Sequence, residues 1–372
     1  MSGRLALRRG VVASERPLEV EVEGKRRPAW ADTALLGPMR EGDEVVVNIA
    51  AVELGLGSGG FDVVHVNLTR GLAAIPEGDA HVIKLNYTSL QHPVDPVERK
   101  PEAPLFLHGG MHRKGTAEQR GAPVLVLPLH GHLAPAAWAA AQVRPGLRVG
   151  YVQTGGGALP GSFSRDVATL RERGLLCGHV TAAPAYGGER EALSVAGALD
   201  AAANELGWEA ILVGPGPGII GSDTAFGHGG MAALDSAHAA LSLALPTLIS
   251  PRLSSGDPRE RHRGASHHTL TVLRMLLAPV EVAVPAGESE LARALGQADG
   301  RHHLTEAFAD LVAYAATNLP TTTMGRTLEQ DGLFFAAPLA AGSALAAAVT
   351  GGAGGGDEDD RARDPLPPRQ DP

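Results

Sequence analysis

The sequence predicts an α/β protein in which a smaller amino-terminal antiparallel β domain precedes a doubly wound, mostly parallel sheet. From residue 122 onward, apolar runs of four to six residues alternate with amphipathic stretches long enough for helices, which is typical of right-handed βαβ crossovers. Before residue 100, short β-branched runs separated by turn residues show no long helical period. A length of 372 residues allows two or three domains, at roughly 150 residues each.

The composition is that of a globular protein. Hydrophobic residues make up 44% of the chain and charged residues 20%, which excludes a disordered or collagen-like chain. The 32 basic and 41 acidic residues give a formal charge of −9, which argues against a nucleic-acid-binding surface built from bulk charge. The single cysteine, Cys177, excludes an intramolecular disulfide framework and a cysteine-cluster metal site, and it fits a reducing compartment.

No targeting or membrane-spanning segment is predicted. The apolar stretch around Arg4, Arg8 and Arg9 is too short for a signal peptide. The longest apolar run, Leu333 to Val349, is mostly alanine, contains Pro338 and is shorter than the roughly 20 residues that a bilayer span needs. We therefore expect a cytoplasmic protein without a membrane partner, in which this run forms a buried helix.

Residues 1–100 are predicted to form the amino-terminal β domain, a small antiparallel sheet or partly closed barrel. Its turns contain glycine and aspartate where positive φ angles are favoured. Residues 101–122, rich in proline, glycine and charge, are expected to be a connecting segment, and residues 351–372 a disordered tail. The expected strands are Leu18–Val22, Val45–Ala51, Phe61–Leu68 and His81–Tyr87.

Residues 123–350 are predicted to form the α/β domain. The stretch Glu189–Leu206 has apolar residues at i, i+3 and i+7, which predicts a helix with one buried face. The expected strands are Val124–Leu127, Arg148–Val152, His179–Ala183, Ala210–Val213, Pro246–Ile249 and Glu281–Val284.

This architecture predicts where a ligand would bind. In open parallel sheets, ligands bind beyond the carboxyl ends of the strands. Most of the unusual residues of this chain lie in the segments that follow the predicted strands. These segments are residues 128–132, 153–157, 184–189 and 214–224, and a long loop that runs to residues 262–269.

Two of these segments are rich in glycine. Glycines allow close approach of the backbone to a ligand, and backbone amides in a nest or at a helix amino terminus could hold an anion. The spacing matches neither a P-loop nor the Rossmann fingerprint, and a tight or flexible turn is the alternative. The candidate ligand-binding residues are Gly155, Gly156, Gly216, Gly218, Gly221, Ser222 and Thr224.

Histidines are the candidates for chemistry. His130 and His132 would point to the same side of an extended segment, and His267 and His268 lie where a helix is expected to begin. We name His130, His267 and His268 as candidate catalytic residues that act as general acid or base. Arg263, beside them in sequence, would be a bidentate donor to a carboxylate or phosphate.

Other roles for the histidines stay open. With His262 and with Asp223 or Asp257, they could hold a divalent metal that keeps a water in an open position. They could also cap helices or satisfy buried carbonyl groups. Arg259 and Arg261 are expected to face solvent.

Seven segments of the chain together resemble an uncharacterised bacterial family classed as a domain of unknown function. The resemblance covers nearly the whole chain up to about residue 345, and its most specific segment is His262–Thr269. It implies a shared fold and a bacterial, cytoplasmic origin, but it assigns no activity. The segments are NIAAVELGLGSGG (48–60), KLNY (84–87), LH (129–130), TGGGALP (154–160), GPGIIG (216–221), HRGASHHT (262–269) and TMGR (323–326).

The leading functional hypothesis is an enzyme that acts on a small anionic ligand, with a phosphorylated compound as the first candidate, by histidine-based general acid/base chemistry. The alternatives are a non-catalytic sensor or binding protein that uses the same pocket, and a scaffold whose loops only cap the sheet. No cofactor can be named from the sequence beyond a divalent metal, no nucleic-acid partner is expected, and the oligomeric state stays open. The first two hypotheses require residues 130, 218 and 267 to converge on one opening.

Overall fold

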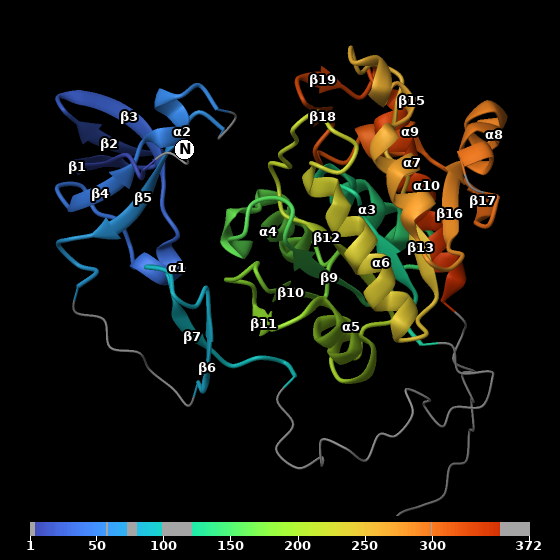
Figure 1. The fold of residues 1–372 in the computed structure, drawn as a ribbon, viewed down its shortest axis with the longest axis horizontal. Helices are drawn as coiled ribbons and strands as arrows, with labels where there is room; N and C mark the ends of the chain where they lie inside the picture. Colours follow the sequence, from blue (N-terminus) through green and yellow to red (C-terminus); the bar gives the residue numbers. More distant parts are fainter. Residues whose placement is uncertain (1–3, 57–58, 73–79, 99–120, 299, 350–372) are drawn as a thin grey trace, which may run out of the picture.

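The computed structural model describes residues 4–56, 59–72, 80–98, 121–298 and 300–349. Within these residues it contains a closed barrel, an eight-stranded sheet and three small two-stranded sheets (Figure 1). The predicted fold class is confirmed. Of the connecting segment expected at 101–122, all but the last two residues lie outside the described part, as does the whole tail expected at 351–372.

The amino-terminal barrel has the strand order β1-β2-β3-β5-β4 and closes through pairing of β1 with β4. Strands β3 and β5 run parallel, whereas the other neighbours are antiparallel. This is the arrangement of an OB-fold, a five-stranded Greek-key barrel. The parallel pair departs from the antiparallel sheet that the sequence predicts, because closing the barrel brings β5 beside β3. The strands are β1 (Leu7–Glu15), β2 (Leu18–Val22), β3 (Lys25–Trp30), β4 (Glu44–Asn48) and β5 (Asp62–Asn67), with short helices α1 (Thr33–Leu36) and α2 (Ala50–Glu53).

A hairpin of β6 (Val82–Lys84) and β7 (His92–Val94) joins the amino-terminal part of the chain to the α/β domain. The buried Lys84 ammonium donates to the carbonyl oxygens of Thr181 at 2.7 Å and Ala185 at 2.8 Å, and it also pairs with Glu191. Burial lowers the pKa of Lys84, and the Glu191 carboxylate opposes this shift. This hairpin therefore packs on the edge of the parallel sheet, beside β10 and β11.

The central sheet is entirely parallel, with the order β11-β10-β9-β12-β8-β13-β16-β17. Successive side chains of its strands point to opposite faces. In β8, Leu125 packs into the hydrophobic core on one face, and Val124 and Val126 pack into the core on the other. The strands are β8 (Val124–Val126), β9 (Val149–Thr154), β10 (Gly178–Ala182), β11 (Arg190–Ala192), β12 (Ala210–Pro215), β13 (Thr247–Ile249), β16 (Glu281–Pro285) and β17 (His303–Ala307).

Helices cover both faces of this sheet (Figure 1). Side chains of α3 (Leu133–Val143), α4 (Arg165–Glu172), α9 (Leu311–Ala315) and α10 (Gly332–Ala348) enter one core. Side chains of α5 (Val195–Asn204), α6 (Ala232–Ser242), α7 (His267–Met275) and α8 (Ser289–Ala298) enter the other. The smaller elements are η1 (His130–His132), η2 (Gly161–Phe163), η3 (Gly229–Met231), η4 (Glu260–His262), and the pairs β14 (Leu253–Ser254) with β15 (Gly264–Ala265) and β18 (Thr322–Thr323) with β19 (Arg326–Thr327).

The helix predicted over Glu189–Leu206 begins later than expected. Residues Arg190–Ala192 form the edge strand β11, and α5 starts at Val195 after the N-cap Ser194. The prediction was wrong at this end because three residues are too few to show a strand period. They become a strand by pairing with β10.

The alanine-rich run forms α10, which is largely buried against α3. A Cβ at Gly342 would overlap the backbone of Ala136 in α3, so glycine allows the close approach of the two helices. Within the residues that the structure describes, no helix combines the length and apolar character needed to cross a membrane.

Candidate functional site

The candidate pocket lies where the loops after two neighbouring strands lead to helices on opposite faces of the sheet. Strand β8 leads into α3 on one face of the sheet, and the adjacent β12 leads into α6 on the other. Such a switch point opens a crevice beyond the carboxyl ends of the strands. A pocket of about 460 Å³ lies there, lined by the segments after β8 (129–131), β12 (217–228) and β13 (252–268), by Asp166 and by residues 322–324. This volume falls in the range typical of small-molecule sites.

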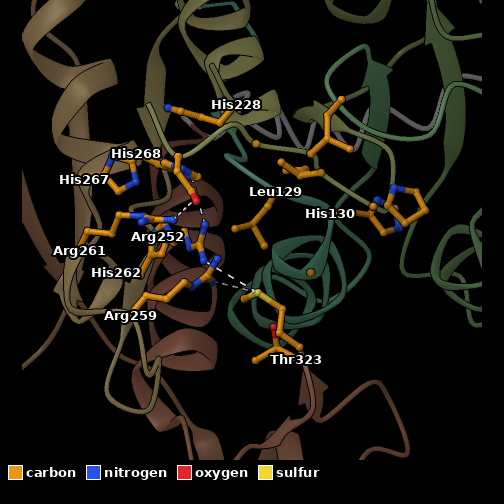
Figure 2. A pocket seen from close by; sticks show the side chains of 18 of the residues that line it. Leu129, His130, His228, Arg252, Arg259, Arg261, His262, His267, His268 and Thr323 are labelled. Atoms are coloured by element: carbon orange, nitrogen blue, oxygen red, sulfur yellow. Dashed lines mark hydrogen bonds and ion pairs between the residues drawn. The ribbon is translucent and has the colours of Figure 1, made fainter. Parts of the chain in front are cut away.

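Residues His130, Gly218 and His267 all line this pocket, although the sequence separates them widely. Figure 2 shows the histidines of the 228–268 region and three arginines on one wall, and His130 on the opposite side, with Leu129 between them. The convergence that the sequence hypotheses require is therefore present in the structure.

One wall carries three arginines, Arg252, Arg259 and Arg261. Arg252 is buried, and its Nη2 lies 3.4 Å from the Oδ2 of the fully buried Asp257. Arg259 donates to both carboxylate oxygens of Asp257, at 2.9 Å each. Arg261 pairs with Asp223, which is exposed. These pairs fix the positive charge along one side of the pocket.

Burial and the neighbouring charges shift the pKa values of Arg252 and Asp257. Burial lowers the pKa of Arg252 to about 10, helped by the neighbouring Arg259 and opposed by Asp257. Burial alone would raise the pKa of Asp257, but hydrogen bonds from the side chain and backbone of Arg259, with the charge of Arg326, hold it well below its usual value. Both groups are charged at neutral pH.

Four imidazoles adjoin the arginines. The rings of His262, His267 and His268 lie 4.3–4.8 Å apart between centroids, and His228 stacks on His268 at 3.6 Å. Ser266, the N-cap of α7, holds two of them: its Oγ accepts from the backbone N–H of His268 at 3.3 Å and lies 2.7 Å from Nδ1 of His262.

These imidazoles are neutral at pH 7. Burial, reinforced by Arg252 and Arg259, lowers the pKa of His262 to about 3. Burial, with His228 and Arg252, lowers the pKa of His268 to about 2. The pKa values of His267 and His228 are also lowered, again chiefly by burial. Each ring can therefore offer one lone pair and one N–H.

His130 faces the opposite wall. Its Nδ1 lies 3.3 Å from the carbonyl oxygen of Pro215, which can only accept, so Nδ1 carries the proton. Its Nε2 lies 2.8 Å from Oγ of Ser164 and therefore accepts the hydroxyl proton. Ser164 also caps α4 by accepting from the N–H of Val167. The carboxylate of Asp166 lies 3.7 Å from Nε2 of His130.

The predicted glycines are distributed over three neighbouring pockets. Gly218, Gly221 and Thr224 line the main pocket with His267 and His268. Gly155 and Gly156 line a second pocket that shares His228. Gly156, Gly218, Gly221 and Ser222 line a third. Gly216 is buried against the loop at Ala158 and lines none of these three pockets.

The glycine-rich segment after β12, residues 214–224, is not a tight turn from strand to helix, because α6 begins only at Ala232. Its hydroxyls bond within the loop: Ser222 Oγ lies 3.1 Å from both the Gly227 carbonyl oxygen and Thr224 Oγ1, and Thr224 Oγ1 accepts from the Gly227 N–H.

The arginine assignment made from sequence differs from the geometry. Arg263 is not among the residues that line the described pocket, and its Nη2 approaches the backbone oxygen of Asp257 at 3.4 Å. Arg259 and Arg261, expected to face solvent, are exposed, and they also line the pocket. The η4 turn at 260–262 separates Arg259 from Arg263. Arg252 was missed altogether, since a lone arginine after a strand carries no sequence signal.

A buried histidine beside the site makes stability depend on pH. His132 accepts or donates one bond to Ser250 at 2.8 Å, and burial, with Arg252 nearby, lowers its pKa to about 3. Below its unfolded value of about 6.5, the unfolded state takes up a proton that the native state does not. The free energy of unfolding should therefore fall as pH drops from 6.5 toward 3, by about 1.4 kcal/mol per pH unit for this one group.

Urea unfolding at pH 7 and pH 5 checks this expectation. His132→Gln should reduce the loss of stability between the two pH values, and replacement of the exposed His303 by Gln should leave it unchanged. A wild-type pH dependence in His132→Gln would contradict the assignment.

The comparisons with known proteins lead to an uncharacterised family. A family model described as "Protein of unknown function (DUF3866)" matches residues 28–342. The chain belongs to this family. The resemblance seen in the sequence is thus confirmed, and DUF3866 has no assigned activity. No curated protein matches the chain.

Among solved structures, the crystal structure of YjeQ from Thermotoga maritima matches with 13% identity over 47% of this chain and a TM-score of 0.14. The match covers 51% of that chain, about half its length. At this TM-score it carries no argument about fold or function.

Proposed function

We propose that this DUF3866 protein is an enzyme that binds a small anionic, phosphorylated ligand in the main pocket and uses the pocket's histidines for general acid/base chemistry. The observation that carries the proposal is the wall on which Arg252, Arg259 and Arg261 lie beside neutral imidazoles. Guanidinium groups bind phosphate through paired N–H donors. The amino terminus of α7, at His267, adds the positive end of a helix dipole.

The hydrogen bonds suggest how protons would be handled. Nδ1 of His268 lies 3.1 Å from Arg252 Nη1, which can only donate, so the ring proton of neutral His268 is on Nε2. The neutral His268 ring therefore presents an N–H as a hydrogen-bond donor, and Nε2 of the neighbouring His267 has no hydrogen-bond partner among the described residues. His130, across the pocket, would complete the set with Asp166.

A specific contact favours the alternative, a sensor that signals through the barrel. Phe163 packs against Trp30 of the barrel at 5.2 Å between ring centroids, and the next residue, Ser164, bonds to His130 in the pocket. Ligand contact with His130 could therefore be passed to β3. An enzyme and a sensor share the pocket, but only the enzyme has turnover to lose.

The proposal is tested by thermal shift and calorimetry with inorganic phosphate, sugar phosphates and nucleotides. At least one of these anions should raise the melting temperature. Arg261→Gln should weaken its binding by about tenfold, the loss of one charge-assisted contact. The matched control is Arg26→Gln, on the exposed side of β3, which should bind as the wild type does.

Failure of every anion to bind, or equal binding by Arg261→Gln, would refute the pocket's role. Once a ligand is known, the wild type is tested for conversion of that ligand to a product. Product formation that is lost in His268→Ala would identify an enzyme. Binding without any product would identify a sensor.

A further inference from the structure

We infer that His262, His267 and His268 hold a divalent transition-metal ion, with zinc as the best match for such ligands, at the edge of the pocket. The inference rests on the proposed function in using the same pocket. It changes the task of His267 and His268 from moving a proton to holding the ion. Three histidine ligands and one open position are the pattern of catalytic zinc sites.

The geometry of the three side chains supports a shared ion. One ring nitrogen from each lies within 4.8 Å of those of the other two. In a tetrahedral zinc site with bonds of about 2.0–2.1 Å, ligand nitrogens are about 3.4 Å apart, so each ring would move by roughly 1 Å. His262 is the last residue of η4, and the other two begin α7, so Ser266 between them fixes the positions of both segments.

The nitrogens of the three rings differ in how freely they could reach a metal. Nε2 of His267 is buried and has no hydrogen-bond partner among the described residues. Nδ1 of His268 is unprotonated and accepts from Arg252, so this lone pair would reach a metal only once Arg252 gives up the bond. Ser266 can accept the Nδ1 proton of His262, which leaves its Nε2 free, and ligating histidines typically donate their other N–H to an oxygen in this way.

A fourth imidazole, His228, stacks on His268 beside the three. His228 is buried, and its Nε2 donates to the Ala225 carbonyl oxygen at 3.1 Å. Its Nδ1 has no partner in the described part of the chain. Two buried ring nitrogens in one cluster, Nδ1 of His228 and Nε2 of His267, thus lack partners, which is costly unless something binds them, and neutral imidazoles suit zinc, copper, iron and nickel.

The positive charge of the nearby arginines is partly compensated by carboxylates, so a cation can bind beside them. Asp257 accepts from Arg252 and Arg259 and also lies 3.6 Å from Arg326, while Arg261 pairs with Asp223. Much of the positive charge is therefore compensated. The charge that remains would attract an anionic group to the open side of the ion.

The test uses the full-length protein, freed of metal by a chelator and titrated with Zn²⁺ by calorimetry and with Co²⁺ by visible absorption. We expect one ion per chain and the intense absorption of four-coordinate cobalt. His262→Ala and His267→Ala should each weaken the affinity at least tenfold, since losing even an outer-shell partner costs 10–100-fold. His303→Ala, an exposed histidine of β17, should bind as the wild type does.

His262 is buried, so its variant must retain the wild-type far-ultraviolet circular dichroism; the more accessible His267→Ala supplies the independent test. No binding by the wild type, the weak absorption of six-coordinate cobalt, or unchanged affinity in His267→Ala would overturn the metal site. Phosphate binding that depends on Arg261 would survive such a result. The two proposals therefore fail separately.

Discussion

Asp257→Asn should lower the free energy of unfolding by about 3–5 kcal/mol, the usual cost of leaving a buried charge without its partner. The Asp257 carboxylate is fully buried and neutralises Arg252, which is itself buried. It also accepts two side-chain bonds and one backbone bond from Arg259 and lies near Arg326. An asparagine keeps the shape but removes the charge that these guanidinium groups share.

The matched control is Asp223→Asn. Asp223 pairs with Arg261 on the same wall, but its side chain is 78% exposed, so its loss should cost less than about 1 kcal/mol. Guanidinium-chloride unfolding measures both variants. Equal losses of stability in Asp257→Asn and Asp223→Asn would show that the Asp257 carboxylate has no special role in stabilising the buried arginines. Asp257→Asn should also weaken phosphate binding, because Arg252 and Arg259 lose the group that orients them.

Gly229→Ala should destabilise the protein by about 1–3 kcal/mol and disturb the pocket, as overpacking does in a tightly packed interior. A Cβ at Gly229 would overlap the backbone oxygen of Gly156, and a Cβ at Gly156 would overlap the oxygen of Gly229. The loops after β9 and β12 thus touch backbone to backbone. Any added methyl must push them apart, and His228, next in the chain, would move with them.

The control for this variant is Gly296→Ala in α8, where a new Cβ would meet Leu304 only at ordinary contact distance. Alanine in a helix should be neutral or stabilising by up to about 1 kcal/mol. Thermal unfolding and anion titration of both variants make the comparison. A fully stable Gly229→Ala that binds anions normally would contradict the close contact.

The fold class could be predicted because hydrophobic period is a local property. Runs such as Ala210–Val213 are apolar throughout because both faces of a parallel strand are covered, and this is visible in the sequence. Strands that form only by pairing with a distant segment were harder to predict from the sequence. The edge strand Arg190–Ala192 has too few residues to show a period, and the parallel pairing of β3 with β5 is imposed by barrel closure.

Part of the candidate site could also be predicted. The rule that loops after parallel strands converge brought His130, Gly218 and His267 to one pocket. It could not decide which arginine enters it. Arg263 was predicted for its place beside the histidines in sequence, whereas Arg259 and Arg261 line the pocket instead.

The sequence by itself determined the layered α/β architecture and the edge of the sheet at which glycine and histidine gather, since both follow from short-range pattern and strand direction. Only the tertiary structure decided the partners of each charge. It joined Arg252 to Asp257, stacked His228 on His268 and left His267 with a buried free nitrogen. The physical reason is that charge pairing and hydrogen bonding act over a few ångströms in space, between residues whose separation along the chain carries no trace of that contact.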